Sequence, residues 1–336
     1  MNPEEISVRE WTVAADGSGD YATIQQAVDA IPAAWLGRTV LHIRPGIYRE
    51  KLRIEKPRVT LRGGDAAATV VTWGDGARKP WPGGGRYGTF RSFTAHIGGD
   101  DFTAEQITFE NTAGSGEKAG QAVAAAVLGD RAAFYGCRFL GRQDTLFAGP
   151  LPPREIEPGG FIGPDADKPR RDSRQYYREC LIRGDVDFIF GSATAVFDRC
   201  QIESCRRPAG EAGYVTAAST PQGKKFGFVF LDCGLAGDAL PGSCYLGRPW
   251  RDFARTVFIR CRMGAHIRPE GFHDWGKTAA AAHTVCFAES GSTGPGAGGK
   301  RAPFVRRLTE EETAGFEVGA VLSPPDGWHP EHGGPG

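Results

Sequence analysis

Two aspartates in this chain, Asp144 and Asp187, have settings that suit nucleophilic or acid–base chemistry. Asp187 lies within residues 184–191, where apolar side chains alternate along the sequence GDVDFIFG, and this is the period of a β-strand with two distinct faces. An acid on such a strand points either into a partly apolar groove or into water. Asp144 lies in a similar run, GRQDTLF, at residues 141–147. The two aspartates can act in one reaction only if the fold brings their carboxylates together.

A repeated pattern around five cysteines indicates how the fold is built. Each repeat reads aromatic-x-x-Cys-x-apolar, and the successive intervals are 43, 20, 33 and 28 residues, the first containing an insertion: Cys137, Cys180, Cys200, Cys233 and Cys261. Irregular repeats of about 20 to 30 residues, each a strand-turn-strand unit, predict a parallel β-solenoid whose coils bury their faces by stacking. An antiparallel sandwich is the alternative, but the sequence shows no clear hairpin pairs.

The cysteines themselves are expected to be structural. The chain has eight cysteines and no CxxC pair, so the pattern predicts neither a disulfide scaffold nor a zinc site. A small apolar side chain buried once per coil explains the repeat. We expect no metal and no cofactor.

The remaining patterns describe the ends and connections of the solenoid. Thr23 begins a helix with a capping-box sequence, and Pro32 ends it, so this helix would cover the open end of the first coil. Short strands follow from Thr39, and a stretch rich in Pro, Gly and charge at residues 151–173 is typical of a long loop. A second capping box at Thr309 predicts a short C-terminal helix.

Bulk properties narrow the classes of function. Among 336 residues, 40 basic residues balance 40 acidic ones, so no basic face for nucleic acid is implied. No apolar run approaches the roughly 20 residues of a membrane span. The start, Met1–Glu5, lacks a signal-peptide pattern, which predicts a cytoplasmic protein or a secreted one whose leader was removed. We expect a monomer with one catalytic domain over residues 1–336, its core at about 10–322 and a loose tail at 323–336.

The cysteine repeat places the two acids in equivalent positions. Asp144 follows Cys137 by seven residues, and Asp187 follows Cys180 by seven residues. Stacked coils would therefore hold the two carboxyl groups about 5 Å apart, one strand spacing. Two carboxyls at that distance separate in pKa, which leaves one ionised as a nucleophile and one protonated as a general acid.

Three further residues suit supporting roles. Arg248 could hold one acid ionised through a bidentate contact. Gln121 and Gln143 offer neutral amide donors for a developing oxyanion. We expect Asp185 to point away from Asp187, and we assign it no catalytic role.

Several motifs carry a family resemblance. They occur in the order GQAVA at 120–124, QDTL at 143–146, GDVDFIFG at 184–191 and LGRPW at 246–250, with supporting matches at 46–50, 107–114 and 293–297. Together they resemble the successive signatures of the pectin methylesterases over about residues 10–320. The insertion at 151–173 is longer than in plant-type members and resembles that of bacterial ones. The resemblance implies a single-stranded right-handed parallel β-helix, in agreement with the cysteine repeat.

The resemblance also implies an activity and roles for residues. The activity is hydrolysis of methyl esters of galacturonate in pectin or methylated oligogalacturonides, with release of methanol, in cell wall modification or pectin catabolism. Asp187 would be the nucleophile and Asp144 the general acid and base. Gln121 and Gln143 would hold the oxyanion, and Arg248 would position Asp187. Residues implied to line the substrate groove are Val186, Phe190 and Trp250.

Other functions on the same architecture stay open. A pectate lyase would need a calcium-binding carboxylate cluster, a polygalacturonase would direct its acids at the glycosidic bond, and a thioesterase-like relative would use the same two acids. A pectin-binding module without catalysis is a further alternative. The loop at 151–173 and the absence of a signal-peptide pattern together suggest a hypothesis: the loop walls the substrate groove, and the enzyme prefers oligogalacturonides to long pectin.

Overall fold

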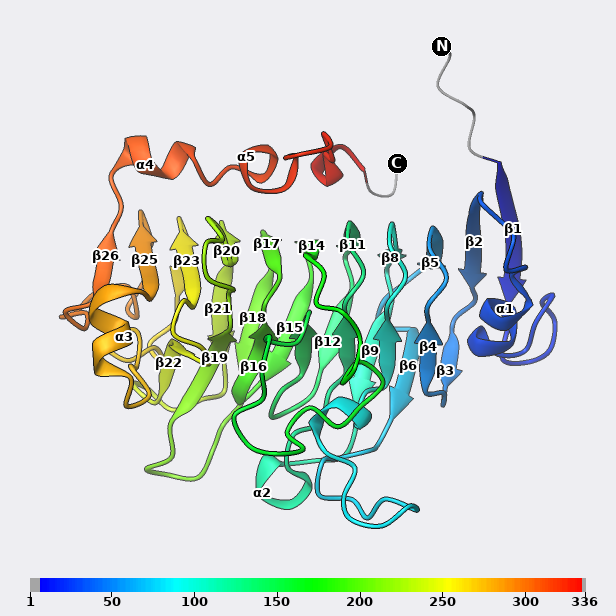
Figure 1. The fold of residues 1–336 in the computed structure, drawn as a ribbon, viewed down its shortest axis with the longest axis horizontal. Helices are drawn as coiled ribbons and strands as arrows, with labels where there is room; N and C mark the ends of the chain where they lie inside the picture. The colour runs from blue at the N-terminus through cyan, green and yellow to red at the C-terminus, as the bar shows by residue number, and fades with distance from the viewer. Residues whose placement is uncertain (1–6, 334–336) are drawn as a thin grey trace.

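The computed structural model describes residues 7–333, and the strands named below pair with one another in parallel. Met1–Glu5, on which the expectation of a cytoplasmic protein rests, lies outside the described residues. Figure 1 shows the strands stacked coil upon coil along the long axis of the molecule. The predicted all-β fold, a parallel β-helix, is confirmed.

Three sheets run along the stack. Sheet A has eleven strands in the described residues: β1 Val8–Val13, β2 Arg38–Ile43, β5 Val59–Gly63, β8 Thr103–Glu105, β11 Ala132–Tyr135, β14 Arg174–Arg178, β17 Thr194–Asp198, β20 Phe228–Leu231, β23 Arg255–Ile259, β25 Cys286–Ser290 and β26 Val305–Arg307. Sheet B has eight there: β3 Gly46–Tyr48, β6 Thr69–Trp73, β9 Thr108–Asn111, β12 Arg138–Leu140, β15 Leu181–Gly184, β18 Gln201–Ser204, β21 Gly234–Gly237 and β24 Arg262–Met263. Sheet C has seven: β4 Leu52–Ile54, β7 Ala95–Ile97, β10 Ala125–Val127, β13 Leu146–Ala148, β16 Val186–Gly191, β19 Gly213–Ala218 and β22 Cys244–Pro249.

Each complete coil therefore contributes three strands, one more than the strand-turn-strand unit expected from the repeat. The short run at 102–109 is divided into β8 and β9. Gln106 lies between them with φ 52°, and this left-handed backbone turns the chain from sheet A to sheet B. Residues immediately before the repeat cysteines adopt the same conformation, as Glu179 and Arg199 show with φ 55° and 51°.

The aromatic-x-x-Cys repeat forms the centre of the core. Its aromatic rings stack from coil to coil with successive centroid distances of 4.9, 4.8, 4.5 and 4.3 Å, in the order Phe134, Tyr177, Phe197, Phe230 and Phe258. The five repeat cysteines are free and buried. The thiol of Cys200 lies 3.3 Å from the carbonyl oxygen of Tyr177 on the preceding coil, to which it donates. The repeat is therefore structural, as predicted, and it sets the alignment of adjacent coils.

Both helices predicted from capping boxes are present. Helix α1, Ile24–Ala30, buries apolar side chains against the first coil, and the Thr23 hydroxyl accepts from the N–H of Gln26. Helix α4, Glu310–Ala314, has both hydrogen bonds of the predicted capping box. The other helices are short: α2 Gly116–Ala119, α3 Thr278–His283, α5 Val318–Leu322, and the 3-10 turns η1 Thr89–Arg91 and η2 Pro330–His332. In the part of the chain that the structure describes, no helix has the length and apolar character needed to cross a membrane.

The C-terminal segment differs from the loose tail that was expected. Figure 1 shows it running back from β26 along the row of coils. Asp326 forms an ion pair with Arg174 at 2.6 Å, and the Tyr135 hydroxyl donates to the carbonyl of Pro330 at 2.7 Å. These polar contacts hold the described part of the segment against sheet A. Asp326 lies far along the chain from its partner Arg174, so the sequence pattern does not reveal the contact.

Candidate active site

Asp144 and Asp187 occupy equivalent places on adjacent coils. Strands β13 and β16 pair so that Leu146 lies opposite Ile189, and the same register two residues earlier places Asp144 opposite Asp187. The N–H of Asp144 donates to the carbonyl of Val186 at 3.0 Å, which continues the contact between the two coils. The equal spacing from the repeat cysteines therefore predicts the pairing correctly.

The backbone at both aspartates departs from a regular strand. Asp144 has φ 62° and Asp187 has φ 49°, a left-handed conformation that is unusual outside glycine. The pairing of β16 with β19 shifts register between Val186 and Ile189, as at a β-bulge. Consequently Phe188 and Ile189 both join the interior core. The simple alternation predicted for 184–191 is wrong at this point because the bulge reverses the order of faces.

A cleft of about 210 Å³ collects most of the predicted site residues on the outer face of sheet C. Its lining consists of Thr89, Phe90, Gln121, Gln143, Asp144, Gly160, Asp187, Phe190, Ala217, Arg248, Trp250 and Trp275. All five predicted catalytic residues are in this set, together with Phe190 and Trp250. Val186 is not: it is buried, with 7% of its surface exposed, and it pairs with Tyr214 on β19.

Five residues of the lining escaped the sequence analysis: Thr89, Phe90, Gly160, Ala217 and Trp275. Most come from connections between strands, where no periodic pattern marks a side chain as facing the cleft. Phe90 packs edge-on against Phe147, 5.0 Å between centroids, and so joins the cleft to the outer face of sheet C. The aromatic character of Phe90 and Trp275 was the only available signal.

Arg248 binds Asp187 with two parallel hydrogen bonds. Its Nε donates to Oδ1 at 2.8 Å and its Nη2 to Oδ2 at 2.6 Å. The two side chains are 15% and 10% exposed, so the pair is largely removed from water. A bidentate contact of this kind fixes the plane of the carboxylate and favours its ionised form.

The two carboxyls differ in their electrostatic surroundings. Burial, and then the charge of Asp187, raises the pKa of Asp144 well above its ordinary value, against a smaller opposing effect of Arg248. Burial also raises the pKa of Asp187, but the hydrogen bonds and charge of Arg248 oppose this directly. Asp187 therefore ionises first, and Asp144 retains its proton.

The side-chain amides of Gln121 and Gln143 face the cleft without internal partners. Their backbones are fixed, because the carbonyl of Gln121 accepts from Ala77 at 2.8 Å and that of Gln143 from Ala122 at 3.0 Å. Within residues 7–333, no hydrogen bond joins either side-chain amide to another residue. Both amides are thus free to donate to an oxygen placed between them and Asp187.

Asp185 lies outside the cleft. It is buried, and its Oδ1 is 3.9 Å from Nη1 of Arg207. Burial raises the pKa of Asp185, with Arg207 opposing the change. This placement agrees with the absence of a catalytic role. Among the described residues, no group of three or more His, Cys, Asp or Glu side chains is arranged to hold a metal ion.

The loop at 151–173 forms one wall of the cleft. It contains no helix or strand, as predicted. Gly160 lines the cleft, and the ring of Phe161 packs edge-on against Trp250, 6.3 Å between centroids, and against Phe90 at 5.9 Å. The loop therefore packs an aromatic side chain, which the motifs did not identify, against two residues of the cleft lining.

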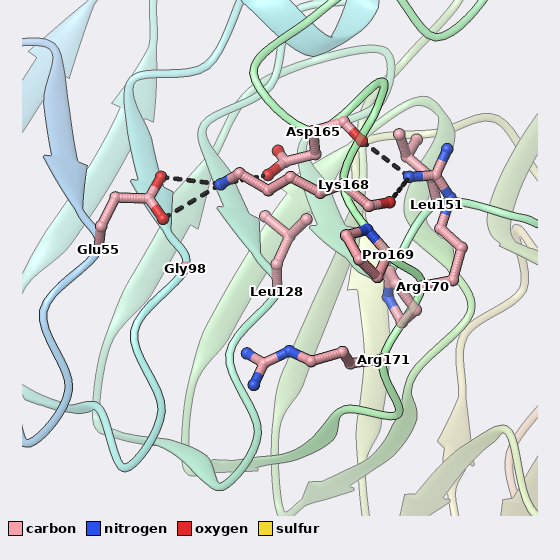
Figure 2. Close-up of a pocket in the computed structure, with 10 residues that line it drawn as sticks. Glu55, Gly98, Leu128, Leu151, Asp165, Lys168, Pro169, Arg170 and Arg171 are labelled. Atoms are coloured by element: carbon pink, nitrogen blue, oxygen red, sulfur yellow. Dashed lines mark hydrogen bonds and ion pairs between the residues drawn. The ribbon is translucent and has the colours of Figure 1, made fainter.

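A cluster of charged residues holds this loop against the β-helix. His96 on β7 is 1% exposed, and its Nε2 lies 2.6 Å from Asp165. Lys168 pairs with Asp165 at 3.0 Å and with Glu55, just after β4, at 3.2 Å. Figure 2 shows Lys168 reaching from the loop to Glu55, across a second pocket of about 320 Å³ between the loop and the ends of the sheet C strands. We refer to Glu55, His96, Asp165 and Lys168 as the loop latch.

Comparison with known proteins identifies the family. The pectinesterase family model matches residues 10–150 and 170–321, and so omits residues 151–169 of the cleft-wall loop. Pectinesterase 31 of Arabidopsis thaliana is 38% identical over 320 residues, which cover 93% of this chain and 92% of that protein. Pectin methylesterase from carrot is 32% identical, with a TM-score of 0.79 over 93% of this chain and 92% of its own.

A pectin methylesterase crystallised with a hexasaccharide is 27% identical, with a TM-score of 0.77 over 95% of this chain and 97% of its own. None of these matches tests whether the insertion at 151–173 resembles that of bacterial members, so this resemblance stays a prediction. The matches cover the whole β-helix and every motif found in the sequence. The chain belongs to the pectinesterase family and is a carbohydrate esterase that acts on pectin.

Proposed function

We propose that the esterase removes methyl groups from galacturonate units by covalent catalysis at Asp187, with Asp144 as general acid and base. The observation that carries the proposal is the asymmetry of the carboxyl pair in one cleft. Asp187 is bound by both hydrogen bonds of Arg248, whereas burial and its neighbour keep Asp144 protonated. One group is thus prepared to attack and the other to donate a proton.

In the first half of the reaction, a carboxylate oxygen of Asp187 attacks the carbonyl carbon of the methyl ester. The amides of Gln121 and Gln143 donate to the resulting oxyanion. The bond to the methoxy oxygen then breaks, and Asp144 gives its proton to that oxygen, so methanol leaves. The products of this half are an anhydride between Asp187 and the galacturonate, and an ionised Asp144.

In the second half, water attacks the anhydride. Asp144, now a carboxylate, takes a proton from this water, and the bond to Asp187 breaks. The galacturonate leaves with a free carboxyl group, while Asp187 is again ionised and Asp144 again protonated. Arg248 stabilises the Asp187 carboxylate as leaving group with the same two hydrogen bonds.

One assay on methylated pectin separates this function from its alternatives. Methanol, new reducing ends and the absorbance of an unsaturated product are measured in the same reaction. The proposal predicts methanol alone. New reducing ends would indicate a polygalacturonase, unsaturated product a lyase, and none of the three a binding module. Parallel measurement on a small-molecule thioester tests the thioesterase alternative.

We further propose that the cleft-wall loop favours methylated oligogalacturonides over long pectin. Three observations support this proposal: the loop lines the cleft through Gly160, it packs Phe161 on Trp250, and the latch holds it down. The test compares turnover on polymeric pectin with turnover on methylated oligomers at equal ester concentration. A strong preference for the polymer contradicts the proposal. We propose that the enzyme is a monomer, and light scattering checks this state under the same conditions.

A further inference from the structure

Arg248 is enclosed by two aromatic rings as well as by Asp187. Its guanidinium carbon lies 3.9 Å from the ring centroid of Tyr214 and 3.7 Å from that of Trp275. The hydrogen bonds to Asp187 engage Nε and Nη2 of the guanidinium, and both rings lie within 4 Å of its carbon. Arginine side chains favour such stacking, and the attraction strengthens where water is excluded.

Tyr214 is placed to act through Arg248. It lies on β19, the strand beside β22, with Ala217 of β19 directly opposite Arg248. Its ring stacks on that of Tyr245 of the next coil, at a centroid distance of 5.3 Å and an interplanar angle of 12°. Tyr214 is not among the residues that line the cleft. Its contact with the site therefore passes through the guanidinium.

Trp275 contacts Arg248 from a strained backbone. Its φ is 53°, a conformation that is unfavourable for a bulky side chain and persists only where the surroundings enforce it. The N–H of Trp275 donates to Nδ1 of His273 at 2.9 Å. Because a backbone N–H can only donate, Nδ1 is the acceptor and the imidazole proton is on Nε2.

The same histidine connects the two rings that enclose Arg248. The imidazole of His273 packs edge-on against Tyr214, with 6.1 Å between centroids, and against Tyr245 at 5.1 Å. One side chain thus contacts the tyrosine ladder through its ring and holds the backbone of Trp275 through Nδ1. His273 therefore joins the two residues whose rings contact Arg248.

We propose that Tyr214 and Trp275, linked by His273, are positioning residues that fix Arg248 and through it the nucleophile. This inference rests on the proposed role of Asp187. With two rings packed against it, the guanidinium is held in one orientation, and its two donors stay aligned with the carboxylate in the free enzyme and during attack. Loss of a ring leaves the pairing partners in place but allows the arginine to turn and water to reach it.

The test uses Tyr214, because Trp275 also faces the substrate cleft. Tyr214→Leu should lower kcat by about tenfold or more while KM stays within about twofold, since orientation of the reacting group is lost and binding surface is not. The acid limb of the pH profile of kcat/KM should move to higher pH, because a loosened Arg248 lowers the pKa of Asp187 less effectively. Tyr214→Phe retains the ring and should behave like the wild type.

Trp35→Leu is the matched control. The guanidinium carbon of Arg9 lies 4.3 Å from the ring centroid of Trp35, a stack of the same kind, and neither residue lines the cleft. This variant should keep kcat within about threefold of the wild type, and thermal unfolding of all three variants reports their folding. Wild-type kcat in Tyr214→Leu, an unmoved acid limb, or equal losses in Tyr214→Phe and Tyr214→Leu would each overturn the proposal.

The outcome for Asp187 separates the two levels of inference. If Asp187→Asn retains wild-type methanol release, the proposed mechanism fails and the positioning role fails with it. If Asp187→Asn is inactive but Tyr214→Leu is unchanged, the positioning role alone fails.

Discussion

Asp144 lies opposite Asp187 in the register that pairs β13 with β16, and only Asp187 of the two is hydrogen-bonded to Arg248. Two acids of the same type therefore differ in function because of one neighbour. The arginine favours ionisation of the residue that it binds, and the resulting negative charge makes ionisation of the second residue harder. The stacked coils of the β-helix supply both relationships, because each side chain comes from a different coil.

Removal of the Arg248 charge should move the acid limb of the activity profile. Arg248 opposes the rise that burial causes in the pKa of Asp187, so Arg248→Met should raise that pKa further and narrow the range in which Asp187 is ionised. We expect kcat/KM to fall by about 10²-fold or more at neutral pH and the acid limb to shift to higher pH. An acid limb that stays in place in a folded variant would show that Arg248 does not control ionisation of the nucleophile.

Replacement of Asp144 should affect stability in a pH-dependent way. The pKa of Asp144 is raised in the folded state, so the folded protein binds this proton more tightly than the unfolded chain, and the wild type loses stability as pH rises above about 4, the unfolded pKa. Asp144→Asn has no titrating group at this position and does not lose stability in this way. Its free energy of unfolding, relative to that of the wild type, should therefore increase by up to about 1.4 kcal/mol per pH unit until the pH reaches the folded pKa of Asp144.

Urea unfolding at a series of pH values from 4 to neutrality measures the difference. Asp167→Asn is the control, because it makes the same substitution at an exposed position of the cleft-wall loop, outside the active site. A difference for Asp144→Asn that is flat across this range contradicts the raised pKa.

The two glutamine amides should matter in the transition state more than in substrate binding. Gln143→Ala and Gln121→Ala each remove a donor that has no partner among residues 7–333. We expect kcat to fall by about 10²- to 10³-fold for each, with little change in KM. Steady-state kinetics on a methylated oligogalacturonide measures both constants. An increase in KM at unchanged kcat would assign the amides to ground-state binding.

Release of the cleft-wall loop should change substrate preference. Asp165 contacts both His96 and Lys168 in the latch, and Asp165→Ala removes both interactions. We expect cleavage within residues 151–173 by a protease to become about tenfold faster, and turnover on polymeric pectin to increase relative to turnover on oligomers. Asp167→Ala changes an exposed aspartate of the same loop and should alter neither. Faster proteolysis without any change in substrate preference would separate the loop from specificity.

The arrangement of coils could be predicted from the sequence because one physical requirement recurs. Each coil must place an aromatic ring and a small thiol at the same point of the interior, and Phe134 with Cys137 or Tyr177 with Cys180 reveals this directly. The alignment of these pairs then carries Asp144 and Asp187 into register. Pairing of the two acids is thus a consequence of core packing that can be read from spacing alone.

What escaped prediction depends on backbone geometry and on loops. The bulge at Asp187 places Phe188 and Ile189 on the same side, and alternation cannot reveal a left-handed residue. The strands of sheet C are as short as three residues, as in β10, too few for a period. Trp275 lines the cleft, and Phe161 packs against its lining. Both lie on connections whose paths depend on contacts such as the His273 hydrogen bond and the latch, and such contacts leave no periodic pattern in the sequence.

Methanol release by Asp187→Asn, compared with Asp185→Asn, tests the central claim most directly. Both changes remove a buried carboxylate from the same segment, but only Asp187 faces the cleft and binds Arg248. With both variants shown to be folded by circular dichroism, we predict that Asp187→Asn releases no methanol above background and that Asp185→Asn retains most of the wild-type rate. Near wild-type release by Asp187→Asn would contradict the assignment of the nucleophile.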